Sequence, residues 1–153
     1  MTLLKMYQIL YDLYGHRGWW PADTTDEIVI GAILTQNVSW SNVEKAIKAL
    51  IAHKLLSLGA IYLTSPEDIA KLIVPTRYYN QKAQKLKNYA EFLHDVYNCS
   101  HVDMFQHEAA YLRKQLLQVK GIGRETADSI LLYAGNKLQF VSDAYTSRML
   151  GRL

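Results

Sequence analysis

The sequence predicts an all-α protein. Apolar residues recur at helical spacing along most of the chain, as in Ala83, Leu86, Ala90, Leu93 and Tyr97. Several apolar stretches follow residues that favour a helix start, and no segment shows the sustained alternation of apolar and polar residues typical of strands. The 153 residues contain no internal repeat and no Gly/Ser linker, so we expect one continuous domain over 1–153.

The N-terminal part predicts two helices separated by an aromatic loop. Residues 2–14 carry a broken apolar stripe, and residues 15–25 form a loop that holds Trp19, Trp20 and Pro21. Thr24 and Glu27 have the spacing of a capping box and predict a helix that runs to about residue 34. Because this helix is apolar on all sides, we expect it to lie buried at the centre of the fold.

Four further helices are expected along the rest of the chain. Their signals are a capping box at Ser41 and Glu44, a start at Ser65-Pro66 closed by Pro75, an amphipathic stretch over 83–97 and a helix over about 104–119. The lysines of the amphipathic stretch are expected on its outer face.

Composition excludes several classes of protein. The net charge of +3 is compatible with nucleic acid but is not diagnostic. No apolar run has membrane length, and the first 14 residues do not resemble a signal peptide, so we expect an intracellular protein. Cys99 is the only cysteine, and the five histidines show no metal-ligand spacing. We therefore expect no metal site, and most histidines on solvated helix faces.

Residues 117–131 predict a tight hairpin between two helices. Gly121 and Gly123 enclose one hydrophobic residue, Ile122, and such a turn needs glycine where φ is positive. The turn leaves main-chain N–H groups free to face an anion such as a DNA phosphate, with Lys120 and Arg124 adding positive charge. An ordinary turn with a glycine cap is the alternative for Gly-x-Gly alone. The small pair that follows, Thr126-Ala127, favours close packing of the second helix and hence a DNA-binding hairpin over about 109–135.

Four segments in order resemble the helix-hairpin-helix (HhH-GPD) DNA glycosylases of the endonuclease III superfamily. They are residues 31–37 (Gly-Ala-Ile-Leu-Thr-Gln-Asn), 79–83 (Tyr-Asn-Gln-Lys-Ala), 121–128 (Gly-Ile-Gly-Arg-Glu-Thr-Ala-Asp) and 141–145 (Val-Ser-Asp-Ala-Tyr). The resemblance implies a six-helix-barrel lobe with an incomplete second lobe. It also implies double-stranded DNA with a damaged base as the partner, the base being flipped out of the stack because its glycosidic bond is otherwise out of reach.

The resemblance marks Asp143 as the catalytic carboxylate. From the residues alone Asp143 is a helix cap with Thr146 three positions on, where main-chain N–H groups favour the ionised form. Family members that also cleave the DNA strand carry a lysine at the position of Glu125, which forms a Schiff base with the sugar. Glutamate cannot do this, so the resemblance implies a monofunctional enzyme that uses water.

Aromatic residues indicate the class of base. Trp-Trp-Pro (19–21) followed by Leu-Thr-Gln-Asn (34–37) resembles the endonuclease-III-like 3-methyladenine glycosylases. Trp20 and Trp40 are the candidates for stacking on an alkylated purine, and the structural alternative is that such aromatics belong to the core or its rim. Gln36 or Asn37 is expected to fill the gap left by the flipped base. Arg77 stands where the family has a glycine, which puts the geometry of that turn in question.

The resemblance also bears on the end of the chain. Family members continue with further helices, some of which hold a four-cysteine iron–sulfur cluster, so we expect a C-terminally truncated domain without a cofactor. No obligate protein partner is expected. The alternatives are a non-catalytic DNA-binding hairpin module and an endonuclease III-type glycosylase for another lesion or mismatch.

Overall fold

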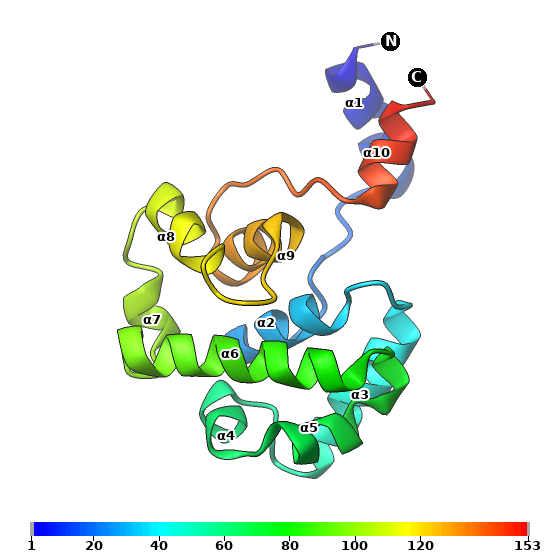
Figure 1. Cartoon of the computed structure of the whole chain (residues 1–153). Helices are drawn as coiled ribbons and strands as arrows, with labels where there is room; N and C mark the ends of the chain where they lie inside the picture. The colour runs from blue at the N-terminus through cyan, green and yellow to red at the C-terminus, as the bar shows by residue number, and fades with distance from the viewer. Residues whose placement is uncertain (1, 153) are drawn as a thin grey trace. The chain divides into compact units, whose positions relative to one another are not determined.

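The computed structural model describes residues 2–152, and every regular element within that range is a helix (Figure 1). The prediction of an all-α fold is therefore confirmed. The chain forms two compact units, one of residues 22–141 and one that combines residues 1–21 with 142–153.

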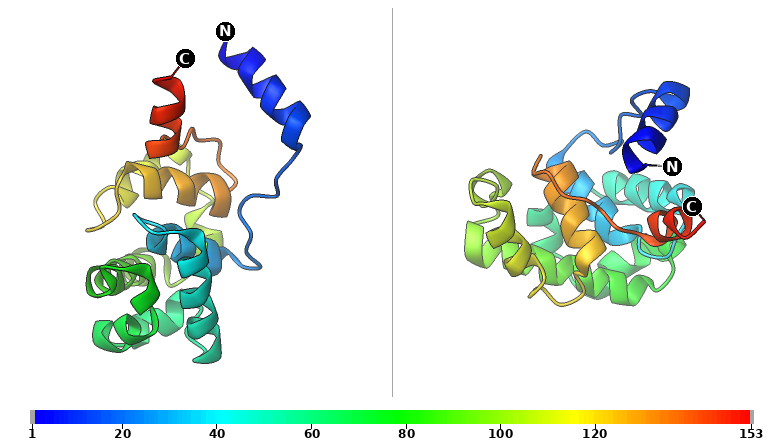
Figure 2. Two further views of the ribbon diagram at one scale, coloured as in Figure 1. Left: turned by 90° about the vertical axis from the view of Figure 1, so that its right-hand side faces the viewer. Right: turned by 90° about the horizontal axis from the view of Figure 1, so that it is seen from above.

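The larger unit contains ten helical elements among the described residues. They are α2 (Thr25–Leu34), α3 (Trp40–Ala52), α4 (Leu58–Leu63), α5 (Pro66–Leu72), the 3₁₀ turn η1 (Val74–Thr76), α6 (Tyr79–Tyr97), α7 (His101–Met104), α8 (Ala109–Leu116), α9 (Arg124–Ser129) and the π-helical turn η2 (Ile130–Ala134). Helix α6 is the longest, and α4 and α5 pack along it, as the views of Figures 1 and 2 agree.

Helix α2 lies at the centre of this unit, as its sequence predicts. Its residues 29–34 are all buried, and it packs against α3, α6, α9 and η2. Thr24 caps the helix, since its hydroxyl accepts the N–H of Glu27 at 3.1 Å. The Glu27 carboxylate reaches back to the N–H of Asp23 at 3.0 Å, one residue earlier than in a standard capping box.

Two helix boundaries differ from the predictions. Helix α3 begins at Trp40, with Ser39 at its cap and no side-chain cap hydrogen bond, so the capping box expected at Ser41 and Glu44 is wrong. The Ser41 hydroxyl lies 3.2 Å from that of Ser39 instead. The helix expected over about 104–119 is divided into α7 and α8, because the chain leaves helical geometry between Phe105 and Glu108.

The start of α5 agrees with the sequence. Ser65 accepts the N–H of Asp68 at 3.2 Å, and Pro66 occupies the first turn. The helix ends at Leu72, before Pro75, which lies within the 3₁₀ turn η1.

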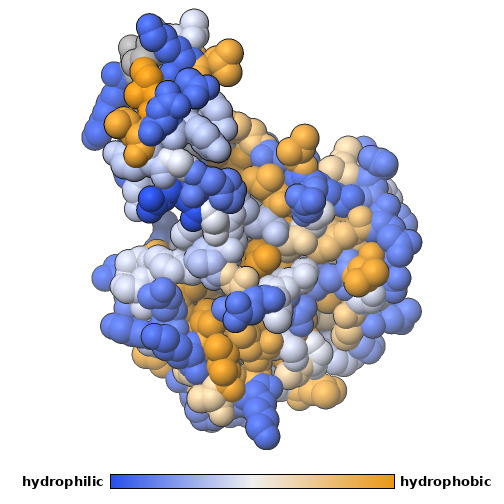
Figure 3. All heavy atoms as spheres, turned by 180° about the vertical axis from the view of Figure 1, so that it is seen from behind, coloured by the Kyte–Doolittle hydropathy of each residue, from blue (hydrophilic) through white to orange (hydrophobic). Residues whose placement is uncertain are grey.

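The smaller unit contains α1 (Leu3–Tyr14), the loop with the paired tryptophans, and α10 (Ala144–Leu150). None of the described residues of these two helices is buried, and α1 exposes Leu3, Leu4 and Leu13 by more than 60% each. Seen from behind, the molecule carries apolar side chains between polar ones on its surface (Figure 3). Within residues 2–152, no helix has both the length and the apolar character to cross a membrane.

Candidate DNA interface and active-site residues

The predicted hairpin lies between α8 and α9. The N–H of Ile122 donates to the carbonyl of Val119 at 3.0 Å, and the Ile122 side chain is buried under the turn. Across the hairpin, the Arg113 guanidinium makes a bidentate ion pair with Asp128, at 2.7 and 3.1 Å. This pair joins α8 to α9 and holds the two helices of the hairpin at a fixed spacing.

Only one of the two hairpin glycines needs its conformational freedom. Gly121 has φ of 97°, and a Cβ added there would lie 2.3 Å from Cγ of Lys85. Gly123 has φ of −91° and ψ of −179°, an extended conformation open to any residue, with no atom within 4 Å of an added Cβ. The turn therefore needs glycine for a positive φ at Gly121 and not at Gly123. Its surroundings are open, so its role is to leave space at the tip of the hairpin.

The hairpin presents main chain and positive charge to solvent. Gly123 precedes α9 as its N-cap residue and makes no side-chain cap hydrogen bond to that helix. Lys120 and Arg124 are exposed on either side, as the sequence predicts. Thr126 and Ile122 were expected among the DNA-contacting residues, but their side chains are buried, which leaves main-chain groups alone to contact a phosphate there.

The segment that follows α2 separates the two wedge candidates. Gln36 is half-buried, its amide nitrogen donates to the Thr126 hydroxyl at 3.0 Å, and its amide oxygen accepts from Nζ of Lys85 at 2.5 Å. Asn37 is exposed and has φ of 54°, in the left-handed region that asparagine tolerates. Gln36 is thus held inside the protein, and Asn37 is the residue whose side chain meets solvent.

A buried lysine fixes the backbone beneath this segment. Nζ of Lys82 donates to the carbonyls of Leu34 and Thr76, at 2.8 and 2.5 Å, and the residue is only 2% exposed. Burial, together with the neighbouring ammonium of Lys85, lowers the pKa of Lys82 to about 8. The lysines of the 83–97 stretch were expected on the outer face of the helix, whereas Lys82, which precedes that stretch, is buried on the inner face. It shares a face with Leu86 and Leu93 at positions i, i+4 and i+11, a signal that the sequence contained.

Lys82 also brings a second exposed corner close to the end of α2. The corner consists of Arg77 and Tyr78, which directly follow the carbonyl of Thr76. Arg77 has φ of 56° and ψ of 159°, a region in which glycine is usual, so the arginine adopts the glycine-type geometry that its family position calls for. Tyr78 has φ of 44° and is 66% exposed. The segment with the exposed Asn37 and the corner of Arg77 and Tyr78 therefore lie on either side of one buried ammonium.

Asp143 caps α10, as predicted. Its Oδ1 accepts both the N–H and the hydroxyl of Thr146 at 2.7 Å each. Burial alone would raise the pKa of Asp143, but the hydrogen bonds from Thr146 and from the N–H of Tyr145 outweigh it, and the pKa lies below its ordinary value. The carboxylate is therefore ionised at neutral pH and half-exposed.

The tryptophans occupy accessible positions. The rings of Trp19 and Trp20 lie 5.3 Å apart at 51°, in the unit that also contains Asp143. Trp19 is 48% exposed and Trp20 is half-buried. Trp40 is half-buried at the first position of α3. None of the three is fully buried, and half-burial of Trp20 and Trp40 fits both a base-stacking position and the rim of the core.

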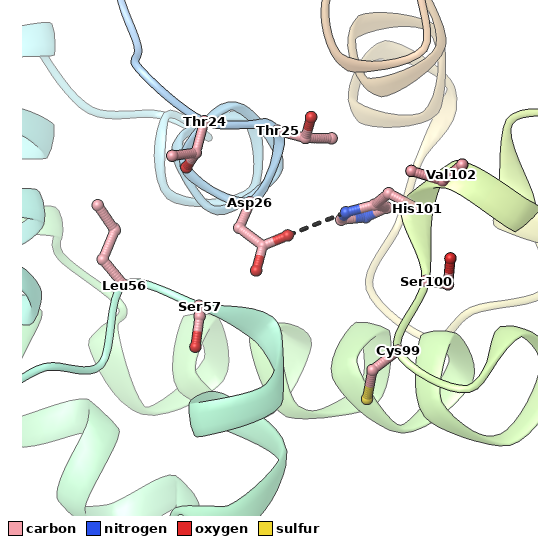
Figure 4. A pocket seen from close by; sticks show the side chains of 9 residues that line it. All are labelled: Thr24, Thr25, Asp26, Leu56, Ser57, Cys99, Ser100, His101 and Val102. Atoms are coloured by element: carbon pink, nitrogen blue, oxygen red, sulfur yellow. Dashed lines mark hydrogen bonds and ion pairs between the residues drawn. The ribbon is translucent and has the colours of Figure 1, made fainter.

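A separate pocket of about 530 Å³ lies at the N-terminal end of α2 (Figure 4). There Asp26 accepts from Nδ1 of His101 at 2.9 Å and from the N–H of Leu58 at 2.8 Å, while Nε2 of His101 pairs with the buried Tyr89 hydroxyl at 3.1 Å. Desolvation would raise the pKa of Asp26, but these hydrogen bonds lower it. His101 is thus a buried linker between α2 and α6, an exception to the expectation that most histidines lie on solvated helix faces.

Comparison with known proteins decides the family. The model of the HhH-GPD superfamily of base excision DNA repair proteins matches residues 30–153. The chain belongs to this superfamily. Its members excise bases from DNA, so the chain is a DNA N-glycosylase, and the predicted family, fold and enzyme class are confirmed.

Individual relatives of this HhH-GPD protein agree with the family assignment. A protein of Methanocaldococcus jannaschii whose provisional name is DNA repair glycosylase is 47% identical over 152 residues, which are 99% of this chain and 69% of the relative. The structure of the H. pylori 3-methyladenine DNA glycosylase MagIII bound to 1,N6-ethenoadenine has a TM-score of 0.84 and 30% identity, covering 97% of this chain and 69% of that one. An endonuclease III–DNA complex has a TM-score of 0.79 at 19% identity, with 97% and 67% covered, and shares the fold.

The sequence predicts the local parts of the candidate DNA interface but not the hydrogen bonds that hold them together. It identified the hairpin, the Asp143 cap and the segment 36–37, which are local patterns. It did not identify the interactions of Lys82 and Lys85 on α6, which depend on how distant segments pack.

Proposed function

We propose that this HhH-GPD glycosylase excises alkylated purines such as 3-methyladenine from double-stranded DNA by hydrolysis. The observation that carries the proposal is the 30% identity, over 97% of the chain, to a 3-methyladenine DNA glycosylase captured with a purine adduct. The Trp19-Trp20-Pro21 sequence supports it, because an alkylated purine is cationic and gains both stacking and cation–π attraction from aromatic faces.

The roles of the aromatic residues follow from their exposure. Trp20 and Trp40 are each half-buried, so part of each side chain remains accessible. Such a ring offers a flat surface to an extruded base without a large loss of side-chain entropy. We assign both rings to base stacking.

Asp143 provides the charge for the reaction. 3-Methyladenine is cationic in DNA, so it leaves with the electron pair of the N-glycosidic bond as a neutral base, and strong protonation by the enzyme is not needed. Positive charge then develops on the sugar, where an ionised carboxylate stabilises it and orients the water that bonds to C1′. The proton of that water passes to solvent. The lowered pKa of Asp143 suits this role.

Strand cleavage is not part of the proposed activity. The exposed residue at the family's Schiff-base position is Glu125, which has no amine to attack the sugar. Lys120 lies on the other side of the hairpin turn. We therefore propose a monofunctional enzyme.

DNA contact is assigned to three neighbouring exposed features of the larger unit. The hairpin offers main-chain N–H groups with Lys120 and Arg124 for a phosphate. Asn37 is proposed as the wedge in place of the flipped base, since Gln36 is held inside. Tyr78, exposed beside that segment, is proposed to stack on a neighbouring base.

The proposed chemistry needs side chains and water alone. One cysteine cannot provide four thiolate ligands, so these 153 residues are proposed to act without an iron–sulfur cluster. We propose further that the enzyme works inside the cell and needs no obligate protein partner.

The test is a panel of lesion-containing duplexes. Each duplex carries one lesion (3-methyladenine, 1,N6-ethenoadenine, an oxidised pyrimidine, or adenine opposite a mismatched base), and released base is measured under single-turnover conditions. Release of the alkylated purines supports the proposal. Release of oxidised pyrimidines alone would assign the chain to endonuclease III-type repair, and binding without release of any base would make it a DNA-binding module.

A further inference from the structure

Three polar side chains of α6, at positions 82, 85 and 88, connect the two DNA-facing segments. Nζ of Lys82 holds the carbonyl at the end of α2, Nζ of Lys85 holds the amide of Gln36, and the Asn88 amide donates to the carbonyl of Lys120 at 2.9 Å. Because residues three apart lie near one another on a helix, these side chains form one row along α6. The row links the loop of Asn37 to the hairpin.

Lys85 is the member that contacts both segments. Its aliphatic stem packs on Gly121, where an added Cβ would lie 2.3 Å from Cγ and 3.2 Å from Cβ of the lysine. Its ammonium then reaches Gln36, which lies 49 residues earlier in the chain. The absence of a side chain at Gly121 is thus what allows Lys85 to reach the segment that carries the wedge.

Gln36 completes the connection from the other side. Its amide accepts from Lys85 and donates to the Thr126 hydroxyl on α9, so both of its polar atoms are used. The Thr126 side chain is buried and lies three residues after Gly123. Gln36 is therefore fixed at once by α6 and by the second helix of the hairpin.

We propose that Lys85 and Gln36 are positioning residues, which form a polar bridge that fixes Asn37 relative to the phosphate-binding hairpin. The inference rests on the proposed function, because it assumes that Asn37 enters the duplex. When the hairpin binds a phosphate, a wedge that is rigidly joined to the hairpin lies at a set distance along the DNA. Loss of the bridge leaves the hairpin and Asn37 in place but no longer fixes the distance between them.

The competing role for Lys85 is direct phosphate binding, and the two roles predict different results. A phosphate contact contributes equally to damaged and undamaged duplex, and its removal lowers the slope of log affinity against log salt by about 0.9. A positioning residue leaves that slope unchanged and affects only complexes in which the wedge enters the duplex.

The experiment uses Lys85→Met, Gln36→Leu and the double variant. Met keeps the stem that packs on Gly121, and Leu keeps the approximate volume of glutamine. Lys120→Met is the matched phosphate control, since Lys120 is exposed beside the hairpin. Gln36→Glu is the conservative variant, because a carboxylate still accepts from Lys85 and from the Thr126 hydroxyl. Affinity is measured for undamaged duplex and for duplex with an abasic site, and 2-aminopurine next to that site reports local extrusion by its fluorescence.

The expected results separate the bridge from the wedge function. Lys85→Met and Gln36→Leu should each weaken abasic-site binding about ten-fold, with reduced 2-aminopurine fluorescence and unchanged binding of undamaged duplex. The double variant should be no weaker than either single variant, and Gln36→Glu should restore most of the signal. Lys120→Met should weaken both duplexes alike.

Two results would overturn the inference. One is an equal loss on both duplexes with a smaller salt slope for Lys85→Met, and the other is additivity of the two single variants in both binding and urea unfolding. The unfolding cycle is measured without DNA, so it tests the bridge even if the wild-type chain shows no preference for abasic DNA. A wild-type chain with no preference for abasic DNA would refute the proposed wedge, and the positioning role with it. In that case a non-additive unfolding cycle would still show the bridge as a structural feature.

Discussion

Replacing the two hairpin glycines one at a time separates folding from DNA binding. Gly121→Ala places a Cβ at φ of 97° and 2.3 Å from Cγ of Lys85. Left-handed strain at a non-glycine residue costs about 1–2 kcal/mol, and the forced shift of the lysine stem adds about 1–3 kcal/mol of overpacking. We expect a loss of about 3 kcal/mol in the free energy of unfolding, or roughly 6–12 °C in Tm for a chain of this size.

Gly123→Ala is the matched control within the same turn. Its backbone is extended and its Cβ meets no atom within 4 Å, so the free energy of unfolding should change by no more than about 0.5 kcal/mol. The added methyl group enters the open space at the hairpin tip, where the phosphate is proposed to lie. We expect duplex affinity to fall about ten-fold, which corresponds to about 1.4 kcal/mol.

Urea unfolding measures the first effect, and fluorescence anisotropy of a labelled duplex at fixed salt measures the second. Wild-type stability in Gly121→Ala would refute the account of the turn. Wild-type affinity in a folded Gly123→Ala variant would refute phosphate binding at the hairpin.

Three further predictions concern single side chains. Arg77→Gly should raise the free energy of unfolding by about 1–2 kcal/mol in urea denaturation, because it relieves a backbone conformation suited to glycine; a lower stability would contradict the strain. Burial holds the pKa of Lys82 near 8, so the folded chain releases this proton at a lower pH than the unfolded chain does. The free energy of unfolding of the wild type, relative to that of Lys82→Met, should therefore rise by about 3 kcal/mol from pH 8 to 10.5. A difference between the two free energies that does not change with pH would contradict the lowered pKa. Borohydride should trap no covalent adduct with abasic DNA, whereas an adduct at enzyme-like efficiency would disprove the role given to Glu125.

Local patterns predicted the parts of the interface that depend on a few consecutive residues. The Thr24 and Ser65 caps, the hairpin turn at Gly121 and the Asp143–Thr146 cap each follow from residues within one turn of a helix. The helix-start signal failed at α3, where Ser39 and not Ser41 is the N-cap residue, and Val43 and Ala46 are buried.

Contacts between distant segments could not be predicted in the same way. Gln36 and Asn37 are adjacent residues with chemically similar amide side chains. Only the packing of α6 against α2 shows that Lys85 holds Gln36 and that Asn37 is exposed. Lys82 precedes the amphipathic 83–97 stretch, and its partners are the carbonyls of Leu34 and Thr76, which no sequence pattern reveals. The burial of His101, an exception among the histidines, also depends on a distant partner, since Asp26 lies 75 residues away.

The most direct test of the account is single-turnover excision of 3-methyladenine from duplex DNA by the wild type and by Asp143→Asn. Asparagine still accepts the hydrogen bonds of Thr146 but carries no charge, so folding and duplex affinity should be retained. Because its hydrogen bonds keep the pKa of Asp143 below the ordinary value, the wild-type rate should show no loss from protonation of this group down to about pH 5. The account predicts a rate at least about 100-fold lower in Asp143→Asn, the size expected when electrostatic stabilisation of the transition state is removed. Excision at the wild-type rate by the Asn variant would contradict the central role of this carboxylate.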